Sequence, residues 1–471
     1  MDSAFQLFKT YREKYLYDRQ TNSIVKISSP TFDELIKVKH GDLPFEQSQA
    51  VGCLRRQGLL APNPVLTIRH PLTELLEHYA ARRVKQLTLQ VTQQCNLRCH
   101  YCAYSGLYTM NRTHCGKRMD FETARKAIDF LFAHSLEQTE VVIGFYGGEP
   151  LLEFELIRQC VAYVHDINEG KKVRFNMTTN GTLLKGEIAQ FLVDNDFNIA
   201  ISLDGSKAEH DANRKFVNGK GSFDTIIHNL TELMNRYPEY GKEHVMIATT
   251  VNPYNDFECV MEYFKTQDII SDNRIVFNDM VQNGLTERLS YEDSFFQIRN
   301  FEYIKLLFAL VKKLDEKYVS QLVIASKTQA DTVKKSLRSH SMLHECYHHS
   351  GPCMPGIFRL FVNVDGAFFP CERVNENLTF FNIGTVDDGF DLDQMKTILN
   401  VGKVTEEDCK KCWNLQQCML CSGEIDLEGE TQPTREKKRI LCHRKQRESL
   451  FALYEQCVLK EFGFELNEEV I

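Results

Sequence analysis

The chain has 471 residues, 43% apolar and 25% charged, which is the balance of an ordinary globular protein of about three domains. Its net charge of −8 lacks the basic excess of a protein that binds nucleic acid or an anionic membrane. No apolar run approaches the roughly 18 residues of a membrane-spanning helix, and the first residues lack the layout of a secretion signal. We therefore expect a soluble cytoplasmic protein that binds neither nucleic acid nor membrane.

Residues 1–84 contain no clustered cysteine and are predicted to form a separate module. Two short strands within 15–27 flank a polar turn, and helices are expected near 30–38 and 45–58. A linker rich in proline then leads to a helix at 72–84.

Between residues 85 and 290, apolar strand candidates alternate with amphipathic helices. The strand candidates are 87–91, 141–145, 173–177, 199–203, 245–248 and 274–277. This alternation predicts a parallel α/β sheet, and we expect a curved, partial (β/α)6 barrel with its chemistry at the carboxyl ends of the strands. Asp120 and Ser222 are predicted to cap the helices that follow them.

The rest of the chain is predicted to divide into three parts. Residues 291–340 have the apolar face of a helical bridge, and residues 446–471 contain a final helix at about 446–461. Residues 341–445 are rich in loops and have too little apolar periodicity for an ordinary core, so we expect bound metal to organise them. The basic run at 435–439 is expected only to solvate the surface around Cys442.

The chain has 16 cysteines, which is many for a protein of a reducing compartment, where clustered cysteines usually bind metal. Cys95, Cys99 and Cys102 directly follow the first strand of the predicted sheet. Three thiolates on one tight loop can hold three irons of a four-iron cluster and leave the fourth iron open to a reactant. A zinc knuckle that uses His100 as its fourth ligand is the alternative.

This CxxxCxxC loop resembles that of the radical S-adenosylmethionine (SAM) superfamily. The resemblance implies a [4Fe–4S] cluster on Cys95, Cys99 and Cys102, with SAM bound to the open iron. It also implies reductive cleavage of SAM to methionine and a 5′-deoxyadenosyl radical, which abstracts a hydrogen atom from the substrate. Tyr101 occupies the family's aromatic position before the third cysteine.

Further residues match the family's pattern for binding SAM. Gly147-Gly148-Glu149-Pro150 resembles the GGEP motif, in which glycines allow close backbone approach and the carboxylate accepts from the methionine ammonium. The resemblance assigns Ser202 and Arg214 to the carboxylate of SAM, for which a guanidinium is well suited. It assigns Asn180 to the ribose side, although Asn180-Gly181 could equally be a turn.

The eight cysteines between residues 346 and 442 resemble the SPASM extension of peptide-modifying radical SAM enzymes. The family's interleaved arrangement implies two auxiliary [4Fe–4S] clusters. One would be held by Cys346, Cys353, Cys371 and Cys421, and the other by Cys409, Cys412, Cys418 and Cys442. The gap of two residues before Cys421 departs from the usual three. Without Cys346, the first cluster would have an open iron for a substrate thiolate, and a zinc ribbon is the alternative to both.

Relatives with this extension modify ribosomally made peptides, which leaves two enzyme hypotheses. In sulfatase maturases that form formylglycine, an Asp after the cysteine of a Pro-Cys-Asp segment is the general base, and here Glu372 follows Cys371. In peptide maturases that form thioether or carbon–carbon crosslinks, a small winged-helix-like module binds the precursor.

Residues 1–84 resemble this precursor-recognition module, and we favour the thioether-forming maturase. The leader of the precursor peptide would add to an edge of the sheet within residues 1–84. A flavodoxin- or ferredoxin-type protein is expected as the electron donor. A structural or dimerisation role for the module, and a non-catalytic electron carrier or metal-dependent binding protein, remain the alternatives.

Overall fold

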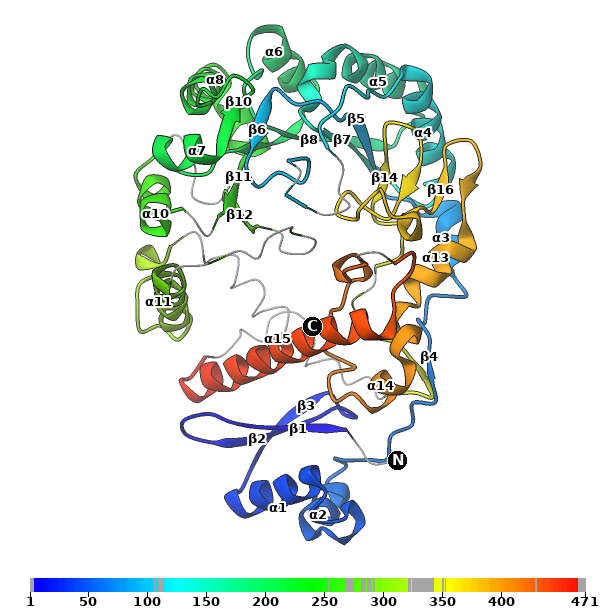
Figure 1. Cartoon of the computed structure of the whole chain (residues 1–471), viewed down its shortest axis with the longest axis vertical. Helices are drawn as coiled ribbons and strands as arrows, with labels where there is room; N and C mark the ends of the chain where they lie inside the picture. Colours follow the sequence, from blue (N-terminus) through cyan, green and yellow to red (C-terminus); the bar gives the residue numbers. More distant parts are fainter. Residues whose placement is uncertain are drawn as a thin grey trace.

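The computed structural model describes residues 4–105, 107–108, 113–252, 255–267, 275–280, 285, 290, 293–320, 323, 343–349, 351, 353–427 and 430–464. A large sheet with its covering helices forms one end of the molecule, and the N-terminal module forms the other (Figure 1). The long helix α15 (Arg435–Glu461) crosses the middle between them.

An eight-stranded sheet has the order β12-β11-β9-β8-β7-β5-β14-β15. Six of its strands are β5 (Gln86–Thr92), β7 (Glu140–Gly147), β8 (Lys172–Thr179), β9 (Asn198–Ser202), β11 (Val245–Val251) and β12 (Ile275–Asp279). Neighbours among these six pair in parallel, which confirms the predicted strands and the α/β class. All six carboxyl ends therefore lie along one edge.

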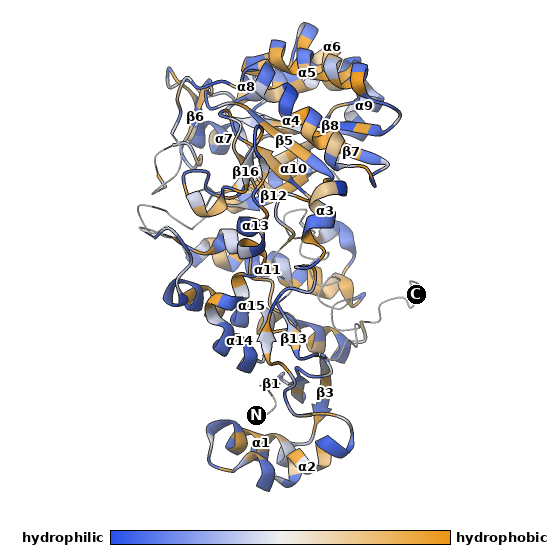
Figure 2. Cartoon of the chain, turned by 90° about the vertical axis from the view of Figure 1, so that its right-hand side faces the viewer, coloured by the Kyte–Doolittle hydropathy of each residue, from blue (hydrophilic) through white to orange (hydrophobic). Residues whose placement is uncertain are grey.

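Helices cover the outer face of this sheet, and the strands beneath them are markedly apolar (Figure 2). These helices are α4 (Phe121–His134), α5 (Phe154–Ile167), α6 (Gly186–Asp194), α8 (Phe223–Arg236) and α10 (Phe257–Thr266). Asp120 caps α4 as predicted, because its side chain accepts from the Thr123 amide at 2.7 Å. The prediction for Ser222 is wrong, since its hydroxyl donates to the Arg214 carbonyl oxygen at 2.8 Å instead of capping α8.

Two strands of the sheet come from the cysteine-rich segment and were not predicted. Strand β14 (Leu360–Val362) pairs in parallel with β5, and β15 (Phe368–Phe369) pairs antiparallel with β14. Strands of three and two residues are too short to show a periodic pattern. They join the C-terminal part of the chain to the strand that leads into the CxxxCxxC loop.

The N-terminal module is an antiparallel sheet packed between helices. Its strands are β1 (Phe5–Lys9), β2 (Lys14–Asp18) and β3 (Ser23–Ile27), followed by α1 (Ser29–His40) and α2 (Gln49–Arg56). Leu16 packs with Leu35 and Leu54 of the two helices, whereas Tyr15 and Tyr17 pack with Leu453 of α15. The two faces follow from the alternation of side chains along β2.

The remaining helices are α3 (Leu76–Arg82), α7 (Lys207–Asn213), α9 (Pro238–His244), α11 (Asp293–Leu310), α13 (Leu392–Leu399) and α14 (Glu406–Lys411). The described residues also form three two-stranded sheets: β4 (Thr67–Ile68) with β13 (Cys346–Tyr347), β6 (Leu97–Cys99) with β10 (Arg214–Phe216), and β16 (Gly384–Thr385) with β17 (Gly389–Phe390). The latter part of the predicted helical bridge, 321–322 and 324–342, lies outside the described residues.

Helix α15 corrects the expectation for the basic run. It begins at Arg435 rather than near residue 446, so the run belongs to its first turns. Lys438 is fully buried there and does not solvate the surface. Across the part of the chain that the structure describes, no helix combines the length and apolar content needed to cross a bilayer.

Candidate active site

The CxxxCxxC loop lies at the carboxyl end of β5. Cys99 ends β6, where it stands opposite Arg214 of β10. The amides of Leu97 and Tyr104 donate to the sulfurs of Cys95 and Cys102, each at 3.4 Å. Amide donors aimed at sulfur suit thiolates that carry negative charge.

Burial dominates the protonation of these thiols. It raises the pKa of Cys95 to about 11 and that of Cys99 to about 12, with neighbouring thiols adding to both shifts. Thiolates in this position therefore need a bound cation, and three soft sulfur donors on one loop fit an iron–sulfur cluster. Among the described residues, no group of three or more His, Cys, Asp or Glu side chains is placed to hold a single metal ion.

The two glycines of the Gly-Gly-Glu-Pro segment lie against the backbone that leads into the cysteine loop. A Cβ on Gly147 would lie 2.1 Å from the Thr92 carbonyl oxygen, and one on Gly148 would lie 2.2 Å from that of Gln94. Gly147 also has φ of +141°, which favours glycine. Their space is thus filled by the backbone that leads into Cys95, and the glycines set the position of the CxxxCxxC loop.

Glu149 is buried beside this contact and joins the ends of β7 and β8. Its carboxylate accepts from the amides of Leu151 and Asn180 and from the Thr179 hydroxyl, at 3.1, 2.7 and 2.7 Å. Burial outweighs these bonds and raises the pKa of Glu149 to about 7. An ammonium ligand would hold this carboxylate in its charged form.

Asn180 is directed at the cysteine loop. Its side-chain amide donates to Asn96 Oδ1 at 2.8 Å and lies 3.8 Å from Cys95 Sγ, and its Oδ1 accepts from Thr182. Ser202 ends β9, half-buried, at the same edge of the sheet.

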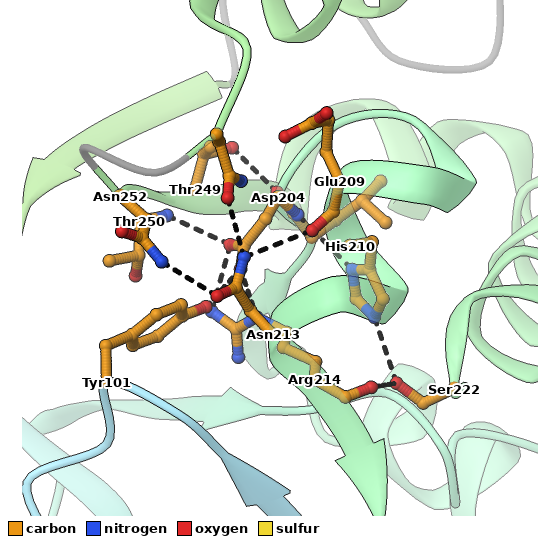
Figure 3. A network of polar contacts seen from close by, with 12 residues as sticks. Tyr101, Asp204, Glu209, His210, Asn213, Arg214, Ser222, Thr249, Thr250 and Asn252 are labelled. Carbon is orange, nitrogen blue, oxygen red and sulfur yellow. Dashed lines mark hydrogen bonds and ion pairs between the residues drawn. The ribbon is translucent and has the colours of Figure 1, made fainter. Parts of the chain in front are cut away.

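A buried network brings Tyr101 and Arg214 together through Asp204 (Figure 3). Arg214 donates to Asp204 through Nε at 2.8 Å and Nη2 at 3.1 Å, and the Tyr101 hydroxyl donates to the same carboxylate. The amide of Thr250 is a further donor, at 3.0 Å. Arg214 thus uses two of its five N–H groups on Asp204, and only the others could bind a carboxylate of SAM.

His210 lies next to this ion pair and hydrogen-bonds with the Asp204 backbone (Figure 3). The Asp204 amide donates to His210 Nδ1 at 3.3 Å, so Nε2 carries the proton and donates to Ser222 Oγ at 2.9 Å. The Ser222 hydroxyl in turn donates to the Arg214 carbonyl oxygen. Burial lowers the pKa of His210 to about 4, so the ring is neutral near pH 7. The role of Asp204 was not predicted, although a buried arginine in the family pattern requires a carboxylate partner.

The C-terminal cysteines form two groups. Cys353, Cys371 and Cys421 interact electrostatically with one another, and so do Cys409, Cys412, Cys418 and Cys442. Cys346 is instead an exposed residue of β13, with Sγ 3.8 Å from the Arg69 carbonyl oxygen. The assignment of these eight cysteines as cluster ligands stays a prediction.

Two carboxylates follow Cys371, and they differ in surroundings. Glu372, the predicted base, is half-buried and pairs with Arg359 at 2.8 Å. Glu376 accepts from Gln90 of β5 at 2.8 Å, and Gln90 also donates to the Tyr104 hydroxyl at 3.1 Å. Glu376 therefore reaches the fully buried Gln90, next to the cysteine loop. No sequence signal pointed to this contact, because Gln90 is one of several alternating polar residues of β5.

We expect Gly148→Ala to displace the loop at Cys95, because the new Cβ would overlap the backbone of Gln94. Overpacking of this kind costs about 1–3 kcal/mol. Iron retained after anaerobic reconstitution and the thermal unfolding midpoint should both fall. Gly116→Ala is the control, since its Cβ would meet no atom within 4 Å. Equal iron retention in the two variants would contradict this role of Gly148.

Residues 89–265 match the family model of the radical SAM superfamily. A cysteine-type anaerobic sulfatase-maturating enzyme of Clostridium novyi is 29% identical over 190 residues, 40% of this chain and 49% of that enzyme. Its counterpart in Clostridium perfringens is 24% identical over 334 residues, 70% of this chain and 85% of the relative. An uncharacterised protein of Methanocaldococcus jannaschii is 40% identical over 144 residues, 30% of this chain and 46% of that protein. The match spans about half the length of the C. novyi and M. jannaschii proteins.

The fold has a counterpart among solved structures. Native anSMEcpe with bound AdoMet matches with a TM-score of 0.56 at 21% identity, over 80% of this chain and 99% of that chain. The same protein with AdoMet and the Kp18Cys peptide matches with a TM-score of 0.55 at 20% identity, over 80% and 97% of the two chains. Residues 89–265 thus match the radical SAM superfamily, and the cysteine loop at the end of β5 lies within this match.

Proposed function

We propose that this protein is a radical SAM enzyme that modifies a ribosomally made precursor peptide by joining a cysteine sulfur to carbon. The observation that carries this proposal is the combination of the CxxxCxxC loop with two further cysteine groups and an N-terminal sheet module on one chain. An electron carrier or a binding protein would not need a buried SAM-type site at the end of β5.

Cys95, Cys99 and Cys102 would hold a [4Fe–4S] cluster, and Glu149, Asn180, Ser202, Arg214 and Tyr101 would surround SAM. When bound, cluster and SAM supply the 5′-deoxyadenosyl radical for hydrogen abstraction. Glu149 offers the methionine ammonium a buried carboxylate. Asp204 fixes the plane of Arg214, so its remaining N–H groups can orient the carboxylate of SAM.

The C-terminal groups would hold auxiliary [4Fe–4S] clusters, one on Cys409, Cys412, Cys418 and Cys442. The other would use Cys353, Cys371 and Cys421. If Cys346, which lies on β13, is not a ligand, this second cluster would keep a position for the thiolate of a substrate cysteine. A substrate thiol that binds there would enter the same C-terminal part as Glu376, which could take its proton as the thiolate forms.

The N-terminal module would bind the leader of the precursor. Strands β1 and β3 are the edges of its sheet, and its two faces are already covered by α1, α2 and α15. An extended peptide would therefore add to an edge through main-chain hydrogen bonds. A flavodoxin- or ferredoxin-type protein would supply the electrons.

The second candidate function is maturation of a sulfatase by conversion of cysteine or serine to formylglycine. The similarity to the Clostridium sulfatase-maturating enzymes favours it. The N-terminal module favours the first candidate, because the anSMEcpe match leaves about a fifth of this chain without a counterpart, a share similar to residues 1–84.

Cys99→Ala should abolish reductant-dependent release of 5′-deoxyadenosine from SAM, because an incomplete set of thiolates cannot hold the cluster. Cys259→Ala, at an exposed site, should cleave SAM as the unmodified protein does. Chromatography of the nucleoside product after anaerobic reconstitution measures both. Unchanged cleavage in Cys99→Ala would refute the radical SAM assignment of this loop.

The two candidate functions differ in the mass change of the substrate. The reconstituted full-length protein should remove two hydrogens per link from a cysteine-containing precursor peptide encoded beside its gene, and the linked cysteine should resist alkylation. A sulfatase-derived peptide should stay unchanged. Conversion of the sulfatase peptide to an aldehyde, with no change in the precursor, would establish the second candidate instead.

Glu376→Gln should reduce product formation by about 100-fold or more if this carboxylate acts as the general base. Release of 5′-deoxyadenosine should continue, since Glu376 is not part of the SAM site. Glu372→Gln should have the smaller effect, because Glu372 is already paired with Arg359. If Glu372→Gln reduces product formation more than Glu376→Gln does, the general base is Glu372 instead.

A further inference from the structure

Two buried cations flank the group formed by Cys409, Cys412, Cys418 and Cys442. The first is Lys438 of α15, which is fully buried. Its Nζ lies 3.8 Å from Cys409 Sγ and donates to Thr405 Oγ1 at 2.5 Å. Its charge also opposes the burial that raises the pKa of Cys442 to about 11.

The second cation is Arg19, which comes from the N-terminal module. It follows β2 and is 1% exposed. Its Nη1 donates to the carbonyl oxygens of Lys410 at 2.8 Å and Cys412 at 3.1 Å. Its Nε and Nη2 are buried and have no hydrogen-bond partner among the described residues.

The turn that carries Arg19 is fixed in place by the cysteine-rich segment. Gln416 donates to the Arg19 carbonyl oxygen, and Gln417 donates to Asn22 Oδ1, both at 2.6 Å. The rings of Tyr17 and Trp413 meet edge to face, with centroids 6.0 Å apart. In Figure 1 the N-terminal sheet accordingly lies beside α15 and the segment that follows α14. Arg19 is therefore held in this position by both parts of the chain.

The carboxylates that act electrostatically on the two cations, Asp18 on Arg19 and Asp408 on Lys438, are shared with other groups. In the described part of the chain, no carboxylate forms an ion pair with Arg19 or Lys438. Asp18 lies next to Arg19 but accepts from the Gln20 amide and from Thr21, and Asp408 is engaged by Arg435. Buried charges are costly unless they are paired. The four cysteines, once they are thiolates, would add negative charge beside both cations.

We propose that Arg19 and Lys438 are the cationic partners of an anionic iron–sulfur cluster on Cys409, Cys412, Cys418 and Cys442, so that the N-terminal module contributes directly to this auxiliary site. The inference rests on the proposed function, since it requires that this group holds a cluster. Positive charge and N–H donors near a cluster favour its reduced form and raise its reduction potential. Arg19 and Lys438 are thus positioning residues for electron transfer, and not catalytic residues.

The test uses the full chain with Cys95, Cys99 and Cys102 replaced by Ala, so that only C-terminal clusters can bind iron. In this background, Arg19→Met and Lys438→Met should each lower the midpoint potential of one of the two cluster signals in an EPR-monitored redox titration. Arg19→Lys keeps the charge and should shift the potential less than Arg19→Met. Arg56→Met, an exposed arginine in the same module, is the control and should leave both potentials unchanged.

The possible failures are distinguishable. If both Met variants bind iron with unshifted potentials, this inference is wrong but the proposed function still stands. The same holds if Arg19→Met lowers the thermal stability of the apo-protein without changing a potential. No iron and sulfide in the background protein would overturn the auxiliary clusters of the proposed function and this inference with them. If Arg19→Met loses iron that Arg19→Lys and Arg56→Met retain, the cationic role is supported.

Discussion

The position of the CxxxCxxC loop depends on the close backbone contact between the ends of β5 and β7. At Gly147 and Gly148 the chain approaches Thr92 and Gln94 so closely that no side chain fits between them. The amides of Gly148 and Glu149 donate to these carbonyl oxygens, at 3.0 and 2.9 Å. Three reactive cysteines are thereby held by main-chain geometry, which leaves their side chains available for metal.

The opposite side of the loop is held by charge. Arg214 stands across from Cys99 in the β6–β10 pair, and its bond to Asp204 extends to Tyr101. A buried ion pair is costly to form but well defined in geometry once its hydrogen bonds are satisfied. Here the amide of Thr250 donates to the Asp204 carboxylate, and the neutral His210 accepts from the Asp204 amide. Steric contact and a polar network therefore fix the same short loop from two directions.

The sequence was sufficient to predict the six parallel strands and the loop at the end of the first, because apolar periodicity and motif spacing are local properties. It was not sufficient for contacts between distant segments. Strand β14 is too short to show a periodic pattern. The burial of Lys438 was not predicted, because this lysine stands in a run of basic residues, and such runs are usually exposed. The engagement of Arg214 by Asp204 likewise appears only when β9 and β10 are brought together.

The pairing of β14 with β5 has a consequence for the behaviour of incompletely folded chains. Strand β5 would be an edge strand if the cysteine-rich segment were disordered, and it would then present a row of unsatisfied N–H and C=O groups. Such an edge is a template for pairing with a second molecule. Residues 360–369 cover this edge of β5 when β14 pairs with it. Folding of the C-terminal part should therefore reduce self-association of the chain and so maintain its solubility.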